Sequence, residues 1–577
     1  MGNIKLCRAY VRGVFPQSLF LGVSALAVAC AMTDPAAAQT STLGRLTVVS
    51  AGSIFTRCTA DHVGSQPGIN YPNTNIEPSV AINPANPGNM LVASHQDRWS
   101  NGGARGLRGA YSFDNGASFH PSSTPDVTAC QNGPWPRSSD PWVTFSPDGA
   151  AYFSSLVTEE LANPALFGHN GQTVSQSIDG GMNWLPPTTL IDTPAQPDAT
   201  KPQALNDKNA VTADPANSRY VYVVWDKLTS FTPGFGVNDE TGGNDGGHAS
   251  ALGTLTPAMP KDGLSITRRL RDLALQGRPF GRVKAANADS AAAAFPTYVT
   301  GPAYFSRTTD YGRHWELPKV IFDPGSNFQT IANQVVVLPS GDILDFYTQQ
   351  NDLSGADNIG WVRSSDHGKT WSPGYSALTL VNVPALTPNR QEAIRSADII
   401  FAIAVDPAHN VIYVTWQDSR FTGQNEVVLA SSPDGGYSWS APVRVNQTPR
   451  RPADPVFQQA LIPSVTAAAD GTVVVTYYDF RHDKVGAATD ATDYWAVSCN
   501  PIKSADGCQG NADWANEARV TTQSFDYNDA PVAGGHFLGD YMGLKSRGQT
   551  VWPVFGISPS KNVTSILTRP WTLTTAK

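Results

Sequence analysis

Five copies of one short turn pattern constrain the fold of this chain more than any other feature. Each copy reads Ser or Thr, any residue, Asp, any residue, Gly, two further residues, and a closing Trp or Phe. The copies are Ser112–Phe119, Ser177–Trp184, Thr308–Trp315, Ser364–Trp371 and Ser432–Trp439. Because they recur from residue 112 to residue 439, the sequence predicts a repeat architecture rather than one irregular domain.

The residue types in this pattern predict a turn between two strands. The Asp carboxylate can accept backbone N–H groups inside the turn, and Gly supplies a positive φ. The closing aromatic ring can be buried between neighbouring units. We therefore expect these Asp residues to build turns rather than to act in catalysis. The pattern resembles the Asp-box, or BNR repeat, of sialidase-type β-propellers.

The composition favours an all-β protein and excludes some partners. The chain has 577 residues, of which 15% are charged, with 50 Gly and 44 Pro. Low charge with many turn-forming residues is typical of many short strands. The net charge of −8 argues against binding to nucleic acid or to an anionic membrane surface.

The first 38 residues have the three parts of a secretory signal peptide. Lys5, Arg8 and Arg12 form a positive region, residues 19–32 are apolar, and residues 36–38 are a small-residue cleavage site. The alternatives are a retained membrane anchor or a lipid anchor at Cys30. Residues 39–577 then form a single secreted or periplasmic domain, with no further segment able to span a membrane.

Four cysteines remain after removal of the signal: Cys58, Cys130, Cys499 and Cys508. An even number in an exported chain predicts disulfides. Cys499–Cys508 would close a short loop, and Cys58–Cys130 would tie the N-terminal segment to the first unit.

A second repeat precedes the Asp-box in each unit and consists of two apolar strands. Its copies start at Glu77, Asp140, Asp207, Asn333, Asp398, Pro463 and Asp540. These starts predict a seven-bladed β-propeller, with six blades as the alternative because sialidases have six. Residues 228–300 are interpreted as a long insertion without strong strand pairs. An N-terminal strand within residues 49–72 would complete the last blade and leave no free edge.

In a propeller the starts of the first strands and the ends of the second strands converge on one mouth. The candidate residues there are rich in carboxylates and guanidinium groups, which suits an acidic or polyhydroxylated ligand. They are Glu77, Asp140, Lys208, Asp540 and Tyr541 at strand starts, and Asp97, Arg98, Arg420 and Arg481 at strand ends, with Glu392 in a loop.

The sialidase resemblance implies a role for each of these positions. Tyr541 resembles the nucleophile, with Asp540 or Glu392 to activate it, and Asp140 or Asp97 would be the acid/base. Arg98, Arg420 and Arg481 would hold a substrate carboxylate, beside Glu77 and Lys208. The segment Asn75-Ile-Glu77-Pro78-Ser79 has no Arg where sialidases carry one, so the sugar stays open. The repeated Asp-x-Arg pattern is equally compatible with ion pairs that brace neighbouring blades.

The leading functional hypothesis is an exported, sialidase-like glycoside hydrolase acting on a terminal or acidic sugar. The alternatives are a non-catalytic propeller that binds a glycan or a protein, and a polysaccharide lyase on the same scaffold. We expect a monomer with a carbohydrate partner and no metal or cofactor. Ca²⁺ in the acidic segment 238–248 is the alternative, although its spacing does not match an EF-hand.

Overall fold

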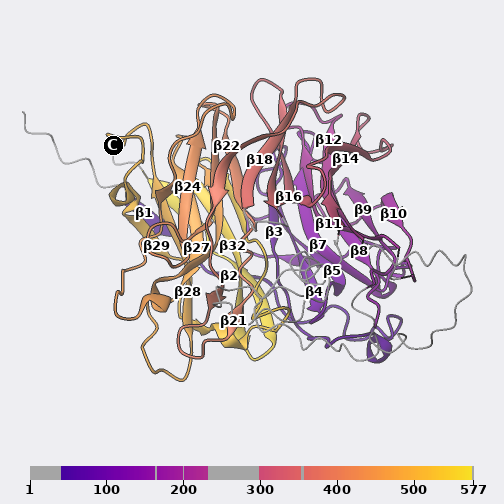
Figure 1. Ribbon diagram of the computed structural model, residues 1–577, viewed down its shortest axis with the longest axis horizontal. Helices are drawn as coiled ribbons and strands as arrows, with labels where there is room; N and C mark the ends of the chain where they lie inside the picture. The colour runs from indigo at the N-terminus through magenta and orange to yellow at the C-terminus, as the bar shows by residue number, and fades with distance from the viewer. Residues whose placement is uncertain (1–39, 163–165, 199–200, 232–297, 352–356, 575–577) are drawn as a thin grey trace, which may run out of the picture.

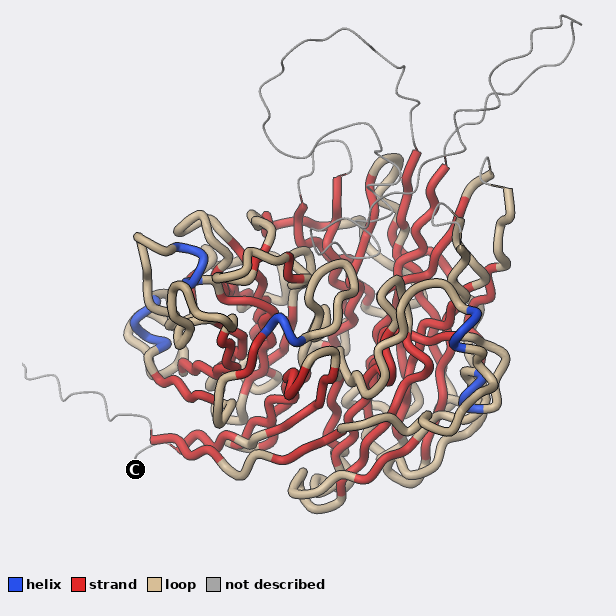
Figure 2. Tube along the Cα trace, turned by 90° about the horizontal axis from the view of Figure 1, so that it is seen from below, coloured by secondary structure: helices blue, strands red, loops and turns tan. Residues whose placement is uncertain are grey.

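The computed structural model describes residues 40–162, 166–198, 201–231, 298–351 and 357–574 (Figure 1). Strands dominate these ranges, which confirms the all-β prediction, and the helical turns among them are short (Figure 2). The turns are η1 (Val63–Ser65), η2 (Ala129–Gln131), η3 (Pro455–Gln458), η4 (Asn511–Trp514) and η5 (Tyr527–Asp529). Within the described ranges, no helix is long and apolar enough to cross a membrane.

Seven four-stranded antiparallel units can be followed through the described residues, one from each predicted start. Units 1 to 3 are β3 (Ser79–Ile82), β4 (Met90–Arg98), β5 (Ala104–Ser112) and β6 (His120–Ser122); β7 (Arg137–Phe145), β8 (Ala151–Thr158), β9 (Asn170–Ser177) and β10 (Thr188–Thr193); and β11 (Gln203–Ala213), β12 (Val221–Phe231), β14 (Ala303–Thr308) and β15 (Lys319–Phe322).

Units 4 to 6 are β16 (Phe328–Val337), β17 (Ile343–Asn351), β18 (Asp357–Ser364) and β19 (Tyr375–Leu380); β22 (Ala402–Asp406), β23 (Val411–Asp418), β24 (Glu426–Ser432) and β25 (Val443–Arg444); and β26 (Ala460–Ala467), β27 (Val473–Asp479), β28 (Ala491–Cys499) and β29 (Asn516–Arg519). Two-residue strands β20 (Ala385–Leu386) and β21 (Ala393–Ile394) pair with each other, and β30 (Phe525–Asp526) pairs with β28.

Unit 7 combines both ends of the described chain. Its strands β31 (Gly543–Arg547), β32 (Thr550–Ser560) and β33 (Val563–Thr568) are followed by β2 (Thr47–Ser50), which pairs with β33. The first strand, β1 (Thr40–Leu43), pairs with the last, β34 (Trp571–Thr574). In Figure 1 the indigo β1 accordingly lies among yellow C-terminal strands. The predicted pairing of an N-terminal strand with the last unit is therefore present, although the strand spans Thr47–Ser50 and not a segment within residues 49–72.

Buried apolar clusters lie between each pair of neighbouring units. One cluster joins Leu91 and Ala93 of unit 1 to Phe153 of unit 2, and corresponding clusters follow up to unit 7. A further cluster joins Trp552 of unit 7 to Met90 of unit 1. Each unit thus buries one face against the unit before it and one against the unit after it, since a single sheet cannot bury both faces alone.

All five Asp-boxes form the same hydrogen-bonded turn between the third and fourth strands of units 1 to 5. In each, the Ser or Thr hydroxyl donates to the Asp carboxylate at 2.7–2.9 Å. The same carboxylate accepts the backbone N–H four residues further on at 2.9–3.0 Å. These bonds stabilise the charged form, and the Ser118 hydroxyl is the main reason that the pKa of Asp114 falls to about 2.

The closing aromatic rings pack across the boundary between units, as predicted. Trp315 of unit 3 meets Tyr152 of unit 2, and Trp439 of unit 5 meets Phe346 of unit 4, both edge-on. The Gly of each turn has a positive φ, for example 100° at Gly436. The turn-forming role of the repeat is therefore confirmed.

A sixth turn of this type, in unit 6, escaped the sequence pattern. The Ser504 hydroxyl donates to Asp506 at 2.8 Å and accepts the backbone N–H of Cys508 at 3.0 Å. Cys508 stands where the other turns have Gly and has a φ of 68°. The pattern missed this turn because Cys replaces the Gly and the turn begins several residues beyond β28.

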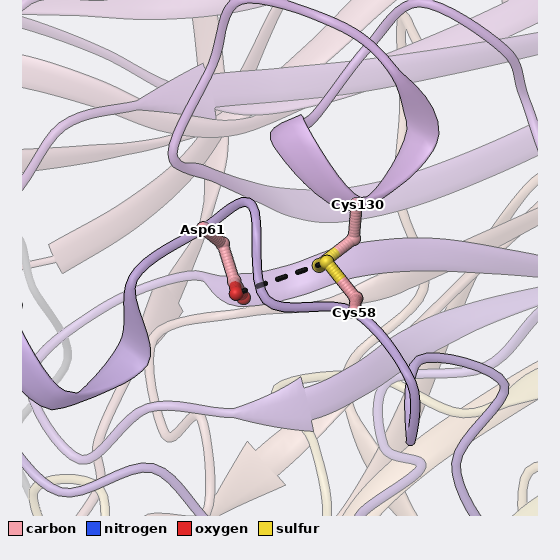
Figure 3. Close-up of side chains that lie close together, drawn as sticks. All are labelled: Cys58, Asp61 and Cys130. Carbon is pink, nitrogen blue, oxygen red and sulfur yellow. Dashed lines mark hydrogen bonds between the residues drawn. A yellow bond between two sulfur atoms is a disulfide. The ribbon is translucent and has the colours of Figure 1, made fainter.

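Both predicted disulfides are present. Cys499–Cys508 ties the sixth turn to the end of β28, and Cys58–Cys130 ties the N-terminal segment to unit 1. Beside the second bridge, Asp61 forms an ion pair with Arg105 at 2.5 Å and lies 3.8 Å from the Cys58 sulfur (Figure 3). The two thiols are thus consumed by the bridge and the carboxylate by Arg105, which leaves this cluster no role as a metal site.

Strand pairing extends into both ends of the predicted insertion at residues 228–300. β12 continues to Phe231, and β13 (Tyr298–Gly301) pairs with it antiparallel and with β16 in parallel. The prediction of no strand pairs over residues 228–300 is therefore wrong at both ends, because β12 simply extends past the repeat. Residues 232–297, including the acidic segment 238–248, lie outside the described residues, as does the predicted signal segment.

Candidate functional site

An irregularity in the first strands brings charged side chains together. Glu77, Asp140 and Lys208 occupy equivalent positions in units 1 to 3 and have φ values of 54°, 52° and 49°. In units 2 and 3 the register shifts at this point, as in a β-bulge. Bulges re-aim a side chain. The same left-handed backbone and register shift recur at Ala332 of unit 4 and Ile462 of unit 6, so this irregularity belongs to the repeat.

Lys208 lies at the centre of the resulting charge cluster. Its ammonium is 2.7 Å from Asp540, 3.3 Å from Asp140 and 3.9 Å from Glu77. Arg395 holds both oxygens of Asp540. Burial alone would raise the pKa of Asp540, but Arg395 and Lys208 bring it well below its usual range. Asp540 is therefore a carboxylate at all physiological pH values, and it occupies the cations that surround it.

His95 joins units 1 and 2 at the edge of this cluster. Its Nε2 lies 2.9 Å from Glu77 and accepts the backbone N–H of Asp140 at 3.0 Å. Burial lowers the pKa of His95, although Glu77 opposes this. Glu77, His95 and Asp140 are close enough to share a metal ion. The Lys208 ammonium already supplies a positive charge to both carboxylates, so the residues present fit an internal ion pair better than a metal centre.

Asp207 and Asp140 form a buried carboxyl pair. Burial, and then the negative charge of Asp140, raise the pKa of Asp207 to about 7. Asp140 lies against Lys208, while Asp207 hydrogen-bonds to Asp140. Burial followed by Asp207 likewise raises the pKa of Asp226, opposite Asp207 on β12. Near neutral pH one member of this group therefore carries a transferable proton.

Tyr541 lies beside the cluster and lines a small cavity with Asp140, Lys208, Asn209 and Asn333. Its hydroxyl donates to the carbonyl of Pro141 at 3.3 Å. Burial, followed by Glu77, Asp140 and Asp540, raises its pKa well above 10. These surroundings oppose formation of the phenolate that a tyrosine nucleophile requires.

The structure brings together Glu77, Asp140, Lys208 and Asp540, with Tyr541 beside them. Arg98 is close by, and its guanidinium, like that of Arg395, lies over the ring of Phe537. Burial and the neighbouring Arg395 lower the pKa of Arg98 to about 10.

Four other predicted residues lie apart from this cluster. Arg420 pairs with Asp418 at 2.7 Å, and Arg481 pairs with Asp479 at 2.6 Å. Glu392 pairs with His536 rather than with Tyr541. Asp97 accepts the Ser53 hydroxyl and the Asn73 backbone N–H.

Sequence reasoning gave no role to three members of the cluster. Asp207 stands at a predicted first-strand start and His95 directly follows a predicted second strand, so both carried a positional signal. Arg395 lies in the loop before unit 5, outside the repeat, where nothing in the sequence marks it. At the cluster itself, no Tyr–His pair of the kind expected of a lyase is present among the described residues.

Comparisons with known proteins agree with the repeat. Residues 303–475 match the family described as BNR repeat-like domain. No curated protein matches the chain. Similar solved structures include a protein of unknown function from Dyadobacter fermentans, with 12% identity, 92% of this chain and 99% of the other covered, and a TM-score of 0.41.

Two further similar structures are enzymes. Hadza microbial sialidase Hz136 has 15% identity, with 83% of this chain and 76% of the other covered, and a TM-score of 0.39. A polysaccharide lyase described as an ulvan lyase has 11% identity, with 72% and 79% covered, and a TM-score of 0.40. Similarity at this level does not decide activity. The family match over residues 303–475 and the five Asp-box turns agree that this chain carries BNR-type repeats.

Proposed function

We propose that the seven units are the blades of a closed seven-bladed β-propeller. Three observations support closure. The apolar cluster around Trp552 and Met90 joins unit 7 to unit 1. The N-terminal strand β2 supplies the fourth strand of unit 7. A cavity of about 450 Å³ is lined by residues from the first strand of every unit.

We propose that the protein is an exported glycoside hydrolase, and that the charge cluster is its catalytic site. The observation that carries this proposal is the Asp207–Asp140 pair, in which Asp207 has a pKa of about 7. A carboxyl group that keeps its proton near neutral pH can act as a general acid on a glycosidic oxygen, with a neighbouring carboxylate as the base.

In this proposal Asp207 donates its proton to the departing glycosidic oxygen. Asp140, whose negative charge is stabilised by Lys208, accepts a proton from the attacking water. Water thereby adds across the broken C–O bond, and the pair returns to its starting state after one proton exchange. The high pKa of Tyr541 disfavours a nucleophilic role. We therefore assign Tyr541 the role of orienting the site from the wall of the small cavity.

The proposal is tested with a panel of aryl glycosides and uronate polymers. We expect kcat/KM to fall above about pH 7, where Asp207 loses its proton. Asp207→Asn should lower kcat by roughly 100-fold or more for poor leaving groups, and much less for dinitrophenyl glycosides, which need no proton. Asp323→Asn, at an exposed carboxylate, is the matched control. Hydrolysis unaffected by Asp207→Asn would exclude this site.

The second candidate is a propeller that binds glycans without cleaving them. It is favoured because the cationic side chains already form ion pairs within the protein. Lys208 and Arg395 both pair with Asp540, Arg420 pairs with Asp418, and Arg481 pairs with Asp479. In that case the panel shows no turnover, while isothermal titration detects glycan binding by the wild-type protein.

Export is proposed from residues 1–38 together with the two disulfides, which form in oxidising compartments. N-terminal sequencing of the protein recovered from the periplasm or medium should begin near residue 39. A mature chain that retains Cys30 with an attached lipid would instead indicate an anchored protein.

A further inference from the structure

The cavity lined by the first strands is separate from the charge cluster. We name it the first-strand cavity; it has a volume of about 450 Å³, and Trp142 and Tyr541 close it at one end. Their rings meet edge-on with centroids 5.1 Å apart, and Asp140 and Lys208 lie beyond them. From there the cavity extends along the first strands to the turns at Pro84, Pro147 and Pro215.

The walls of this cavity expose only slightly more apolar than polar surface. Aliphatic residues of all seven units line it, including Val80, Val211, Val335, Val405 and Leu544. Such a wall, at a volume within the usual range for small-molecule sites, favours a ligand with an apolar body.

The hydroxyl groups in the wall are already engaged between units. Thr212 donates to the carbonyl of Val335 at 2.9 Å, and Ser464 donates to the carbonyl of Met542 at 2.7 Å. Ser546 likewise donates to the carbonyl of Ala467. These side chains hold neighbouring first strands together and leave little hydrogen-bonding capacity for a ligand.

Lys545 is the single charged residue among those that line the cavity. Within the described part of the chain, its ammonium has neither a hydrogen bond nor an ion pair. The side chain of Lys545 is exposed to water. The surrounding protein nevertheless lowers its pKa by burial, and no carboxylate nearby raises it again. A cation in such a position attracts a negative charge, since low-dielectric walls of one sign focus the field.

We propose that the first-strand cavity is a binding site for a small monocarboxylate with an apolar body, held by Lys545. One ammonium matches one carboxylate, and the aliphatic walls match an apolar ring or chain. A sugar suits the site poorly, because the hydroxyls that would bind it are engaged. The site lies outside the charge cluster, so it does not depend on the proposed hydrolase activity.

The probe is 4-bromobenzoate, compared with 4-bromobenzyl alcohol, which has a similar shape and no charge. We expect isothermal titration to show binding of the acid at least tenfold tighter than of the alcohol. Lys545→Met should weaken binding of the acid at least tenfold, and Lys545→Arg should retain the wild-type affinity for it. Lys503→Met, at a surface lysine paired with Asp470, should change affinity less than twofold.

The location of the bound ligand is tested without changing the charge of Lys545. Ala404→Leu narrows the cavity and leaves Lys545 intact, so it should also weaken the acid severalfold. Bromine anomalous scattering from a crystal of the complex should place the ring between the first strands. Equal affinity for acid and alcohol, unchanged binding by Lys545→Met, no binding at all, or bromine located elsewhere would each overturn the proposal.

Discussion

At the scale of single residues, the main feature of the charge cluster is the difference in pKa between its carboxyl groups Asp540 and Asp207. Asp540 is held ionised by two cations, whereas Asp207 faces another carboxylate and is buried. At neutral pH Asp540 is therefore ionised, whereas Asp207 keeps its proton about half of the time. Their environments, rather than their chemistry, assign the proton to Asp207.

Asp207 should make the protein less stable as pH rises. The pKa of Asp207 is about 7 in the folded protein and near 3.8 in the unfolded chain. Between these values the folded state binds more protons than the unfolded state, so the free energy of unfolding falls with increasing pH. The loss is complete above about pH 7 and amounts to at most about 4 kcal/mol.

Asp207→Asn removes this titration. Relative to wild type, the variant should gain stability between pH 4.5 and pH 8, by roughly 1–3 kcal/mol in urea unfolding. Asp323→Asn, at an exposed position, should show no such trend. A stability difference that stays constant with pH would show that Asp207 ionises normally.

At the scale of elements, the sixth turn separates backbone conformation from covalent linkage. Cys508 has the φ of 68° that Gly provides in the other turns, and its disulfide holds that conformation. An L-residue with a side chain is disfavoured there, while Gly is not. In this turn the disulfide therefore holds Cys508 at the positive φ that Gly adopts without strain in the other turns.

A matched pair of variants tests this interpretation. Cys499→Ala/Cys508→Ala should lose roughly 2–4 kcal/mol, as expected when a short disulfide loop is opened. Cys499→Ala/Cys508→Gly should recover about 1 kcal/mol of that loss, because Gly accepts the positive φ. Thermal unfolding of both variants provides the measurement. Equal stability of the two would mean that the turn relaxes once the bridge is absent.

At the scale of the whole molecule, the N-terminal strand joins the two ends of the chain. Val49 of β2 is 4% exposed and belongs to the apolar cluster shared by units 7 and 1, whereas its neighbour Val48 is 55% exposed. Successive side chains of a strand face opposite sides, so one contributes to closure and the other does not.

Val49→Asp should therefore destabilise the whole protein by at least about 3 kcal/mol, because it buries an unpaired charge. Val48→Asp should change stability by no more than about 0.5 kcal/mol. Urea unfolding followed by tryptophan fluorescence should show one shifted transition for Val49→Asp. A separate early transition, with the main one unmoved, would contradict a closed ring of interdependent units.

The sequence by itself determined the repeat, the Asp-box turns and both disulfides. These features depend on local chemistry: a Ser hydroxyl, an Asp carboxylate and a Gly within a few residues are enough to specify the turn. The starts of the seven units were also readable, as at Asp140 and Asp207, because strand patterns are local. The sixth turn was missed because Cys508 breaks the local pattern.

Only the tertiary structure decided which charged side chains meet. Arg395 reaches Asp540 from a loop 145 residues earlier in the chain, and Lys208 reaches it from 332 residues earlier. Arg420 and Arg481 looked alike in sequence to Arg98, yet each pairs with the Asp two residues before it. Ion pairing depends on distance and burial, and both are set by how the units pack, not by neighbours along the chain.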